Sequence, residues 1–374
     1  MSEETRPEWS DPNNPDTCSS IIRKGEELEG SSTAVQRNIR FQKRTKTAPS
    51  IEELYTGILS GNRSSLAKAI TLIESNAEHH FQQAQTLLQK LLPHSGASIR
   101  IGITGVPGAG KSTFIEEFGM YLCGLGHRVA VLAIDPSSSI NGGSILGDKT
   151  RMEQLSRNPS AFIRPSPSGG KLGGVHRKTR EAMLICEAAG YDVILIETVG
   201  VGQSEVIIRD MVDFFMLLVL TGAGDELQGM KKGIMELADA LIVHKADGAN
   251  REKAFQTQKE YNQILHFLQP ATKGWQTKAH TCSSLTKDGI NDVWKVIKTF
   301  VMNGKASGVF EQRRKGQLRE WLYSMITDQL QFQFFHDPEV TLHLPKLENE
   351  VMAGEKTVTI AAEFLFKAFF RKKE

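Results

Sequence analysis

Cysteine is scarce in this 374-residue chain, and the four that occur are far apart: Cys18, Cys123, Cys186 and Cys282. They include no C-x-x-C pair. Such a sparse set argues against a disulfide framework and against a structural zinc site, and it favours a reducing compartment. The sequence therefore predicts a protein of the cytoplasm, or of the mitochondrial matrix if the organism is eukaryotic.

Long apolar runs and an excess of one charge are also missing. No apolar stretch approaches the roughly 18 residues of a membrane span, and the acidic, proline-rich start "MSEETRPEWSDPNNPD" does not resemble a signal peptide. Lys and Arg number 45 against 43 Asp and Glu, so the net charge of +2 gives no sign of binding to nucleic acid or to a membrane surface. With 40% hydrophobic residues, the chain has ample material for the core of a globular enzyme.

The two ends of the chain differ from its middle. Residues 1–50 are polar and contain several prolines, which predicts a disordered tail. Apolar residues recur at three- and four-residue steps within 51–95, which predicts a helical segment. Beyond Gly308 a similar stripe around Trp321 predicts that 308–374 form a helical C-terminal extension.

The middle region, 96–307, alternates short apolar runs with helical segments. Continuous apolar runs bounded by turns are typical of parallel strands covered on both faces. The fold class is therefore α/β, with a mainly parallel sheet and helices on both of its faces. Strands are expected at residues 99–105, 127–135, 160–165, 191–197, 213–220, 239–245 and 278–284.

The stretch "GVPGAGKST" fits G-x-x-x-x-G-K-[ST] at every position and lies between a strand and a helix. In this motif backbone N–H groups and the helix N-terminus hold phosphate. Lys111 is predicted to bridge the β- and γ-phosphates, and Ser112 to bind Mg²⁺. The whole loop is assigned to the nucleotide: Gly105, Val106, Pro107, Gly108, Ala109, Gly110, Lys111, Ser112 and Thr113.

Two acidic residues end neighbouring predicted strands beside this loop. Asp135 and Glu197 offer the hard oxygen ligands that Mg²⁺ prefers, and Glu197 precedes Gly200 by three residues, as the Asp does in the D-x-x-G switch of GTPases. The glycine-rich loops that follow are suited to ordering around a γ-phosphate. Spacing alone fixes no arginine finger or water-orienting glutamine, although Gln203 and Lys231 lie in suitable loops.

The stretch "IVHKADG" resembles the guanine-reading Asn-Lys-x-Asp element, with His244 in place of Asn. Asp247 would accept hydrogen bonds from two donors of guanine, and Lys245 would lay its stem on the base. Ser283, Ser284 and Leu285 stand where a GTPase offers backbone N–H groups to guanine. The usual Asn ties this loop to the phosphate loop, so His244 is expected to remove a brace and to weaken GTP binding without changing the preference for GTP.

Taken together, these stretches resemble the MeaB/ArgK family of P-loop GTPases, which includes the methylmalonic aciduria type A protein of animals. The resemblance rests on "GVPGAGKSTFIE", "LAIDPSS", "GGSILGDKTRM", "FIRPSPSGGKLGGV", "GYDVILIETVGVGQSE", "GDELQGMKKGIMELAD" and "KADG". In order and spacing these motifs cover about residues 51–330. The N-terminal tail lies outside them.

The resemblance implies a homodimeric GTPase that uses GTP, GDP and Mg²⁺ and serves an adenosylcobalamin-dependent acyl-CoA mutase, of the methylmalonyl-CoA or isobutyryl-CoA type. It would gate cofactor loading, protection or reactivation of that mutase without binding cobalamin in its own chain. It also implies Asp148 as a magnesium-site residue beside Ser112, Asp135 and Glu197. Lys231 would assist hydrolysis, in company with Lys111 and Glu197, and the C-terminal helices would form the dimer interface.

Three other functions are compatible with a phosphate loop. One is an ATPase or kinase accessory to amino-acid transport, which no membrane segment in the sequence supports. Another is a metal-insertion GTPase, which would favour His- or Cys-rich tracts that the chain lacks. The third is a non-enzymatic interaction protein with a degenerate site, which the intact Lys111, Ser112, Asp135 and Glu197 disfavour.

Overall fold

The structure is a computed structural model, and it describes residues 49–75, 77–135, 152–167, 172–198, 204–221 and 232–370. Residues from Pro49 onward form one unit. Asp148, Gln203 and Lys231, which the sequence places in the site, lie outside the described residues, and the side chain of Asp135 is not described. Among the described helices, none combines the length and the apolar character needed to cross a bilayer.

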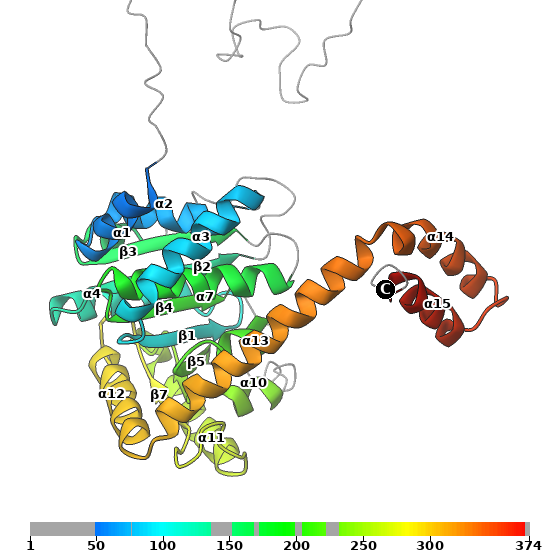
Figure 1. Ribbon diagram of the computed structural model, residues 1–374. Helices are drawn as coiled ribbons and strands as arrows, with labels where there is room; N and C mark the ends of the chain where they lie inside the picture. Colours follow the sequence, from blue (N-terminus) through cyan, green and yellow to red (C-terminus); the bar gives the residue numbers. More distant parts are fainter. Residues whose placement is uncertain are drawn as a thin grey trace, which may run out of the picture. The chain divides into compact units, whose positions relative to one another are not determined.

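A parallel sheet of seven strands, in the order β3-β2-β4-β1-β5-β6-β7, is at the centre of the described residues (Figure 1). Each strand coincides with an apolar run expected from the sequence, and β4 and β5 are buried at every residue, as parallel strands covered on both faces must be. In chain order the strands are β1 (Ile99–Gly105), β2 (Val129–Asp135), β3 (Ala161–Pro167), β4 (Val193–Thr198), β5 (Phe214–Val219), β6 (Ala240–Val243) and β7 (Lys278–Thr281).

Helices cover both faces of this sheet and form two separate apolar cores. Alternate strand residues point to opposite faces, so that Ile194 and Ile196 belong to one core while Val193 and Leu195 belong to the other. The first face is covered by α7 (Leu172–Ala188), α8 (Ser204–Arg209), α10 (Lys232–Leu237) and α11 (Arg251–His266), and the second by α4 (Lys111–Gly124), α6 (Glu153–Arg157) and α12 (Ile290–Ala306). The α/β fold is confirmed.

Three N-terminal helices add to the first face: α1 (Ile51–Leu59), α2 (Arg63–Glu74) and α3 (Glu78–Leu91). Local sequence fixes where two of them begin. Ser50 and Glu53 form a capping box on α1, each side chain bonded to the other's backbone N–H, and the Asn62 side chain accepts from the backbone N–H of Ser64 and Ser65 at the start of α2. Their apolar faces, with Leu66 and Ile70 fully buried, share the core with α7.

The long helix α13 (Val309–Phe335) is anchored by polar side chains at its beginning. The Arg314 guanidinium donates to both carboxylate oxygens of Asp213, at 2.7 and 2.6 Å, and the Gln317 amide donates to the carbonyl of Val212 at 2.8 Å. Arg180 of α7 donates to the carbonyls of Gln317 and Asp210. The start of α13 is therefore bonded to the chain that immediately follows α8.

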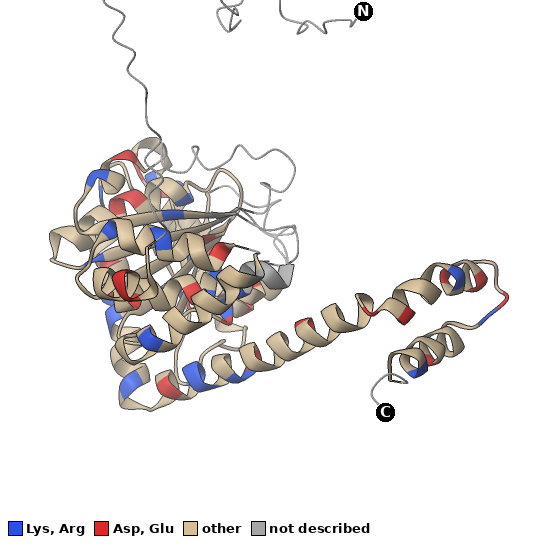
Figure 2. Ribbon diagram, turned by 45° about the horizontal axis from the view of Figure 1, so that its top comes forward, with Lys and Arg blue, Asp and Glu red and all other residues tan. Residues whose placement is uncertain are grey.

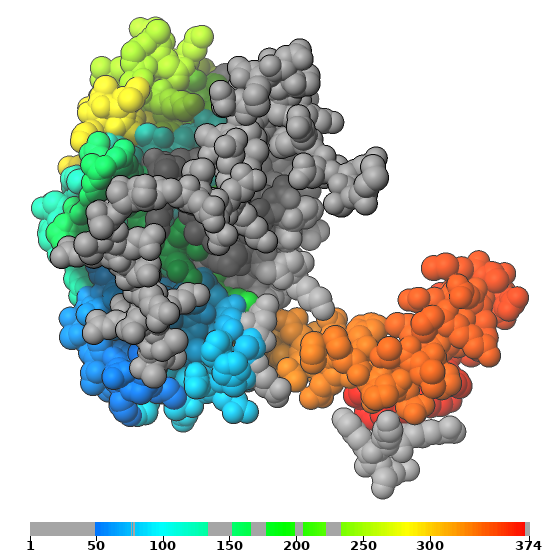
Figure 3. Space-filling model, turned by 90° about the horizontal axis from the view of Figure 1, so that it is seen from above, coloured from blue at the N-terminus to red at the C-terminus, as the bar shows by residue number. Residues whose placement is uncertain are grey.

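The rest of α13 leads to α14 (Pro338–Met352) and α15 (Val358–Phe370), which pack on one another through a small apolar cluster around Val340 and Leu365. Figure 3 shows these helices, in orange and red, projecting from the other described elements. Along α13 a stripe at four-residue steps is about half exposed: Leu318 58%, Leu322 60%, Ile326 46% and Leu330 56%. A contiguous exposed apolar stripe of this kind is typical of an interaction surface.

Candidate nucleotide-binding site

The predicted site residues that the structure describes lie along one edge of the sheet, where the parallel strands end. Asp135 is the last residue of β2 and Glu197 lies near the end of β4, which pairs with both β2 and β1. The phosphate loop follows β1, Lys245 and Asp247 follow β6, and Ser283 follows β7. Because β1 lies between β4 and β5, the chain reverses its winding there, and ligands of open α/β sheets bind at such a point.

The phosphate loop turns between β1 and α4 on three glycines. A Cβ on Gly105 would lie 2.4 Å from the carbonyl oxygen of Leu218 in the adjacent strand. Gly108 and Gly110 have φ angles of +79° and +84°, in the left-handed region that favours glycine. The loop therefore passes close to β5 and opens directly into the N-terminus of α4, whose first N–H groups have no capping side chain.

Lys111, the first residue of α4, folds back over this loop. Its ammonium group donates to the carbonyls of Gly105, at 2.8 Å, and Val106, at 3.3 Å. Burial lowers the pKa of Lys111, and the Glu197 carboxylate partly offsets that effect by favouring the charged form. The described contacts use two of its three hydrogens, which leaves one for a phosphate oxygen.

The side chains of Ser112, on α4, and Glu197, on β4, are in direct contact. The Ser112 hydroxyl donates to Oε1 of Glu197 at 3.0 Å, and Glu197 is buried. Two oxygen atoms that could bind a metal ion thus lie together beside the phosphate loop, at residues that the sequence assigns to the magnesium site. Within the described ranges no cluster of three or more His, Cys, Asp or Glu side chains is suited to a metal ion.

The loop after β6 is shaped around Asp247. The Ser283 hydroxyl donates to Oδ2 of Asp247 at 2.5 Å, which joins the ends of β6 and β7. Lys245 has a left-handed φ of +57°, and its carbonyl accepts from the Asn250 amide at 2.7 Å. Asp247 and Lys245 remain accessible, Ser283 and Ser284 are buried, and Leu285 is exposed. These five residues therefore lie in two adjoining loops.

The expectation that His244 removes the brace between this loop and the phosphate loop is wrong, whereas weaker GTP binding stays a prediction. One ring nitrogen, Nδ1, lies 2.7 Å from the carbonyl oxygen of Ala109 in the phosphate loop. The other, Nε2, lies 2.7 Å from the hydroxyl of Ser284. The imidazole is long enough to contact both loops, a geometry that residue type alone does not reveal.

Two contributors to the site are missed by sequence motifs. The Thr198 hydroxyl donates to that of Thr104 at 2.8 Å in a buried contact that joins the end of β4 to the end of β1. Asn250 accepts from the Thr221 hydroxyl at 2.6 Å while it holds the Lys245 carbonyl, so it links the end of β5 to the loop after β6. An Asn three residues after Asp247 is a weak signal, typical of any turn.

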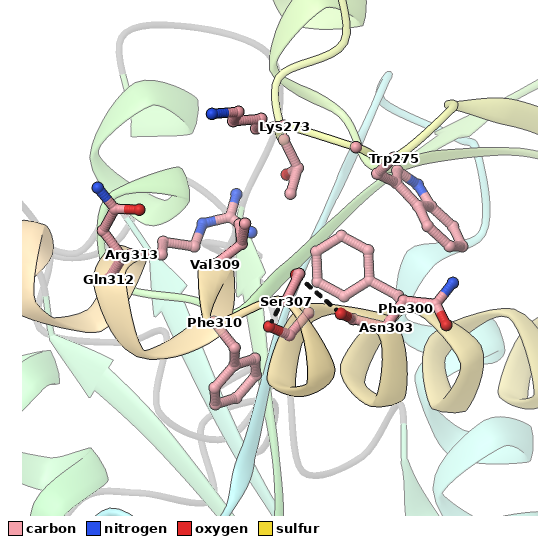
Figure 4. A pocket seen from close by; sticks show the side chains of 12 residues that line it. Lys273, Trp275, Phe300, Asn303, Ser307, Val309, Phe310, Gln312 and Arg313 are labelled. Atoms are coloured by element: carbon pink, nitrogen blue, oxygen red, sulfur yellow. Dashed lines mark hydrogen bonds between the residues drawn. The ribbon is translucent and has the colours of Figure 1, made fainter.

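A separate pocket of about 470 Å³ lies at the opposite edge of the sheet, where β6 and β7 begin (Figure 4). Trp275 and Phe300 form an aromatic wall, and Lys273 and Arg313 lie at its margin. Trp275 also donates to the Asp239 carbonyl just before β6. Among the residues that the structure describes, none of those predicted from the motifs lines this pocket, and no carboxylate lines it.

Comparison with known families connects this geometry to an activity. Residues 66–339 match the family described as "Methylmalonyl Co-A mutase-associated GTPase MeaB", a span that contains the phosphate loop and every other motif residue. The chain belongs to the MeaB family. Its members are GTPases, and the seven-stranded sheet and the phosphate loop described above are those of a P-loop GTPase.

Individual MeaB-family relatives agree with this assignment. A relative from Caulobacter vibrioides is 53% identical over 319 residues, which cover 85% of this chain and 98% of the relative. The "Methylmalonic aciduria type A homolog, mitochondrial" of Mus musculus is 44% identical over 329 residues, covering 85% of this chain and 79% of the mouse protein. A solved structure, "Crystal structure of LAO/AO transport system kinase", is 37% identical with a TM-score of 0.70, covering 85% of this chain and 96% of that one.

Proposed function

We propose that this MeaB-family protein is a magnesium-dependent GTPase that binds an adenosylcobalamin-dependent acyl-CoA mutase of the methylmalonyl-CoA or isobutyryl-CoA type. GTP binding and hydrolysis would gate cofactor loading, protection or reactivation of the mutase. The observation that carries this proposal is the family match itself, whose description names a mutase-associated GTPase and which spans residues 66–339. The mouse relative, named for methylmalonic aciduria, supports the same partner class.

The nucleotide would lie along the carboxyl edge of the sheet. N1–H and the N2 amino group of guanine are both hydrogen-bond donors. Asp247 would therefore accept from them through the carboxylate oxygen that does not accept from Ser283. Lys245 and Leu285, both exposed, would contact the faces of the base, and the backbone of Ser283 and Ser284 would line its edge. The phosphates would lie over residues 105–113.

The residues present suit Mg²⁺, because the Ser112 hydroxyl and the Glu197 carboxylate supply adjacent hard oxygen donors. Asp135, at the end of the neighbouring strand β2, and Asp148 are proposed as further donors, directly or through water. When bound, the ion neutralises charge on the phosphate oxygens. Before the ion binds, the Ser112–Glu197 hydrogen bond would hold these two oxygen ligands next to one another.

Hydrolysis forms a bond from water to the γ-phosphorus and breaks the bond from that phosphorus to the bridging oxygen. Lys111 would stabilise the charge that develops on the leaving oxygen, and the backbone N–H groups at the start of α4 would hold the β-phosphate. Lys231 is proposed to assist hydrolysis in response to a partner. If hydrolysis depends on a partner in this way, the protein alone should hydrolyse GTP slowly.

Addition of the cognate mutase is expected to raise the GTP hydrolysis rate at least about tenfold, because contact with the partner would complete a catalytic arrangement for which the motifs fix no arginine finger or water-orienting glutamine. Phosphate release is measured with and without the mutase, after the two proteins have been shown to co-elute. The Lys111→Ala protein with the same mutase is the control for contaminating hydrolases. Stable binding with an unchanged rate would contradict the proposal.

The exposed stripe on α13 supports a homodimer. Figure 2 shows that charged residues are concentrated at the beginning of α13 and are rare along the rest of it, where Leu322 and Ile326 are about half exposed. Paired Leu322→Glu and Ile326→Glu changes are expected to give a monomer, because they would bury two charges in an apolar contact. Light scattering measures the mass in solution. Leu125→Glu, at a 51% exposed leucine just after α4, should leave the dimer intact.

A kinase accessory to amino-acid transport is a second candidate, favoured only by the name of the 37% identical solved structure. It predicts transfer of the γ-phosphoryl group to a periplasmic binding protein. Incubation with labelled nucleotide distinguishes the two functions, because a GTPase delivers the label to water and a kinase delivers it to the acceptor protein.

A further inference from the structure

His244 occupies a closed position between the two loops of the nucleotide site, and only 2% of its surface is exposed. Its backbone N–H donates to the Val219 carbonyl of β5. Its ring stands edge-on to Phe114, with centroids 5.8 Å apart and an angle of 85°. A Cβ on Gly110 would lie 2.9 Å from the ring, so the imidazole fills the space beneath the phosphate loop.

The two hydrogen bonds of the ring define its protonation. The Ala109 carbonyl can only accept, so Nδ1 carries the hydrogen. In the neutral ring Nε2 is then the acceptor, and the Ser284 hydroxyl donates to it. Burial lowers the pKa of His244, which favours this neutral form.

We infer that His244 is a positioning residue that fixes the phosphate loop relative to the guanine-reading loop and thereby slows nucleotide release. The inference rests on guanine-nucleotide binding at this site, as proposed above. Opening the site to release a nucleotide requires these two loops to separate, and the imidazole contacts both at 2.7 Å. Ser284 acts with it, through its side chain as well as through the backbone.

An asparagine at this position would make only half of the connection. The terminal atoms of an Asn side chain lie as far along the chain as Nδ1 of His, one bond short of Nε2. His244→Asn therefore keeps a donor for the Ala109 carbonyl and loses the contact with Ser284. His244→Gln reaches the position of Nε2 and keeps the other half.

The test is a double-mutant cycle on GDP release, measured with a fluorescent GDP analogue displaced by excess GDP. In the native background Ser284→Ala is expected to accelerate release about fivefold, the effect of one ordinary hydrogen bond. In the His244→Asn background the same change should alter release less than twofold. Ser307→Ala, at a serine hydroxyl that bonds within α12, is the matched control and should change neither rate.

Acid pH gives a second readout, which a merely structural role would not produce. Burial disfavours the charged ring in the closed site, so protonation favours the opened one: the closed arrangement is favoured above the ordinary histidine pKa of about 6.5 and loses this advantage as the pH falls through the lowered pKa. Release should accelerate over that range in the native protein and not in His244→Asn.

Among the described residues, two charged groups act on the protonation of the ring. Lys245, next in the chain, disfavours the protonated ring, and Asp247 favours it. Lys111 is the cation of the phosphate loop. Cys282 directly follows β7. Burial raises the pKa of its thiol to about 12, so the thiol stays neutral.

Equal effects of Ser284→Ala in both backgrounds, or a pH profile shared with His244→Asn, would overturn the inference. If His244→Asn fails to fold, His244→Gln replaces it: it should retain the response to Ser284→Ala and lose the acceleration at acid pH. A native protein that binds no guanine nucleotide would instead refute the proposed function, so the two failures are distinguishable.

Discussion

Lys111→Ala should lower the rate of GTP hydrolysis at saturating nucleotide about 10³-fold, the largest effect expected of any substitution in this protein. The ammonium group is held over the phosphate loop by the carbonyls of Gly105 and Val106, so its remaining hydrogen is directed by the loop itself. Alanine removes the only side-chain cation of this loop. Burial of the site makes the loss greater, because charge interactions are stronger away from water.

Phosphate release under single-turnover conditions measures this effect separately from nucleotide binding. Lys253→Ala is the matched control, because Lys253 is an exposed lysine on α11 that is outside the site. Retention of more than a tenth of the native rate by Lys111→Ala would show that another group stabilises the leaving oxygen. Normal thermal unfolding of the variant shows that its fold is intact.

Asp247→Asn should reduce GTP affinity about 10²- to 10³-fold and create affinity for xanthosine triphosphate. The carboxylate accepts from two guanine donors, and each hydrogen bond to a charged group contributes about 1.5–3 kcal/mol. An Asn amide would face those donors with its own N–H₂ group. Xanthine carries a carbonyl in place of the 2-amino group, so the same amide can donate to it.

Competition of GTP, xanthosine triphosphate and ATP against a fluorescent nucleotide measures this change. Ser283 should continue to position the side chain, because its hydroxyl can donate to the amide oxygen as it does to the carboxylate at 2.5 Å. Asp292→Asn, at an exposed aspartate of α12, should leave all three affinities unchanged. Unaltered GTP binding by Asp247→Asn would remove Asp247 from the base-reading role.

Much of the fold could be predicted from the sequence because the strands are buried on both faces and therefore appear as uninterrupted apolar runs. The expected strand 99–105 coincides with β1, and 191–197 differs from β4 by two residues at its start and one at its end. The phosphate loop could be predicted as well, since backbone geometry favours its glycines and Lys111 completes the motif within the same short stretch. Strand order depends on contacts between distant residues, which no local pattern contains.

The contacts of His244 and of the α13 anchor could not be predicted, for a related reason. In the sequence, a histidine in place of an asparagine indicates a lost contact. In the structure, its ring contacts both Ala109 and Ser284. Arg314 and Gln317 look like solvent-facing residues of a helix, yet both bond to groups at the amino edge of the sheet. Polar side chains reveal their partners only in three dimensions.

The bonded start of α13 also has a mechanical consequence. The part of this helix beyond Gln317 is about 27 Å long, so a tilt of roughly 10° where Gln317 holds the Val212 carbonyl would displace the far end by about 5 Å. The chain that ends at Val212 leads through α8 directly from the segment after Glu197. The C-terminal helix would thus act as a lever arm, which converts a small rotation at the end of α8 into a larger displacement of its own far end.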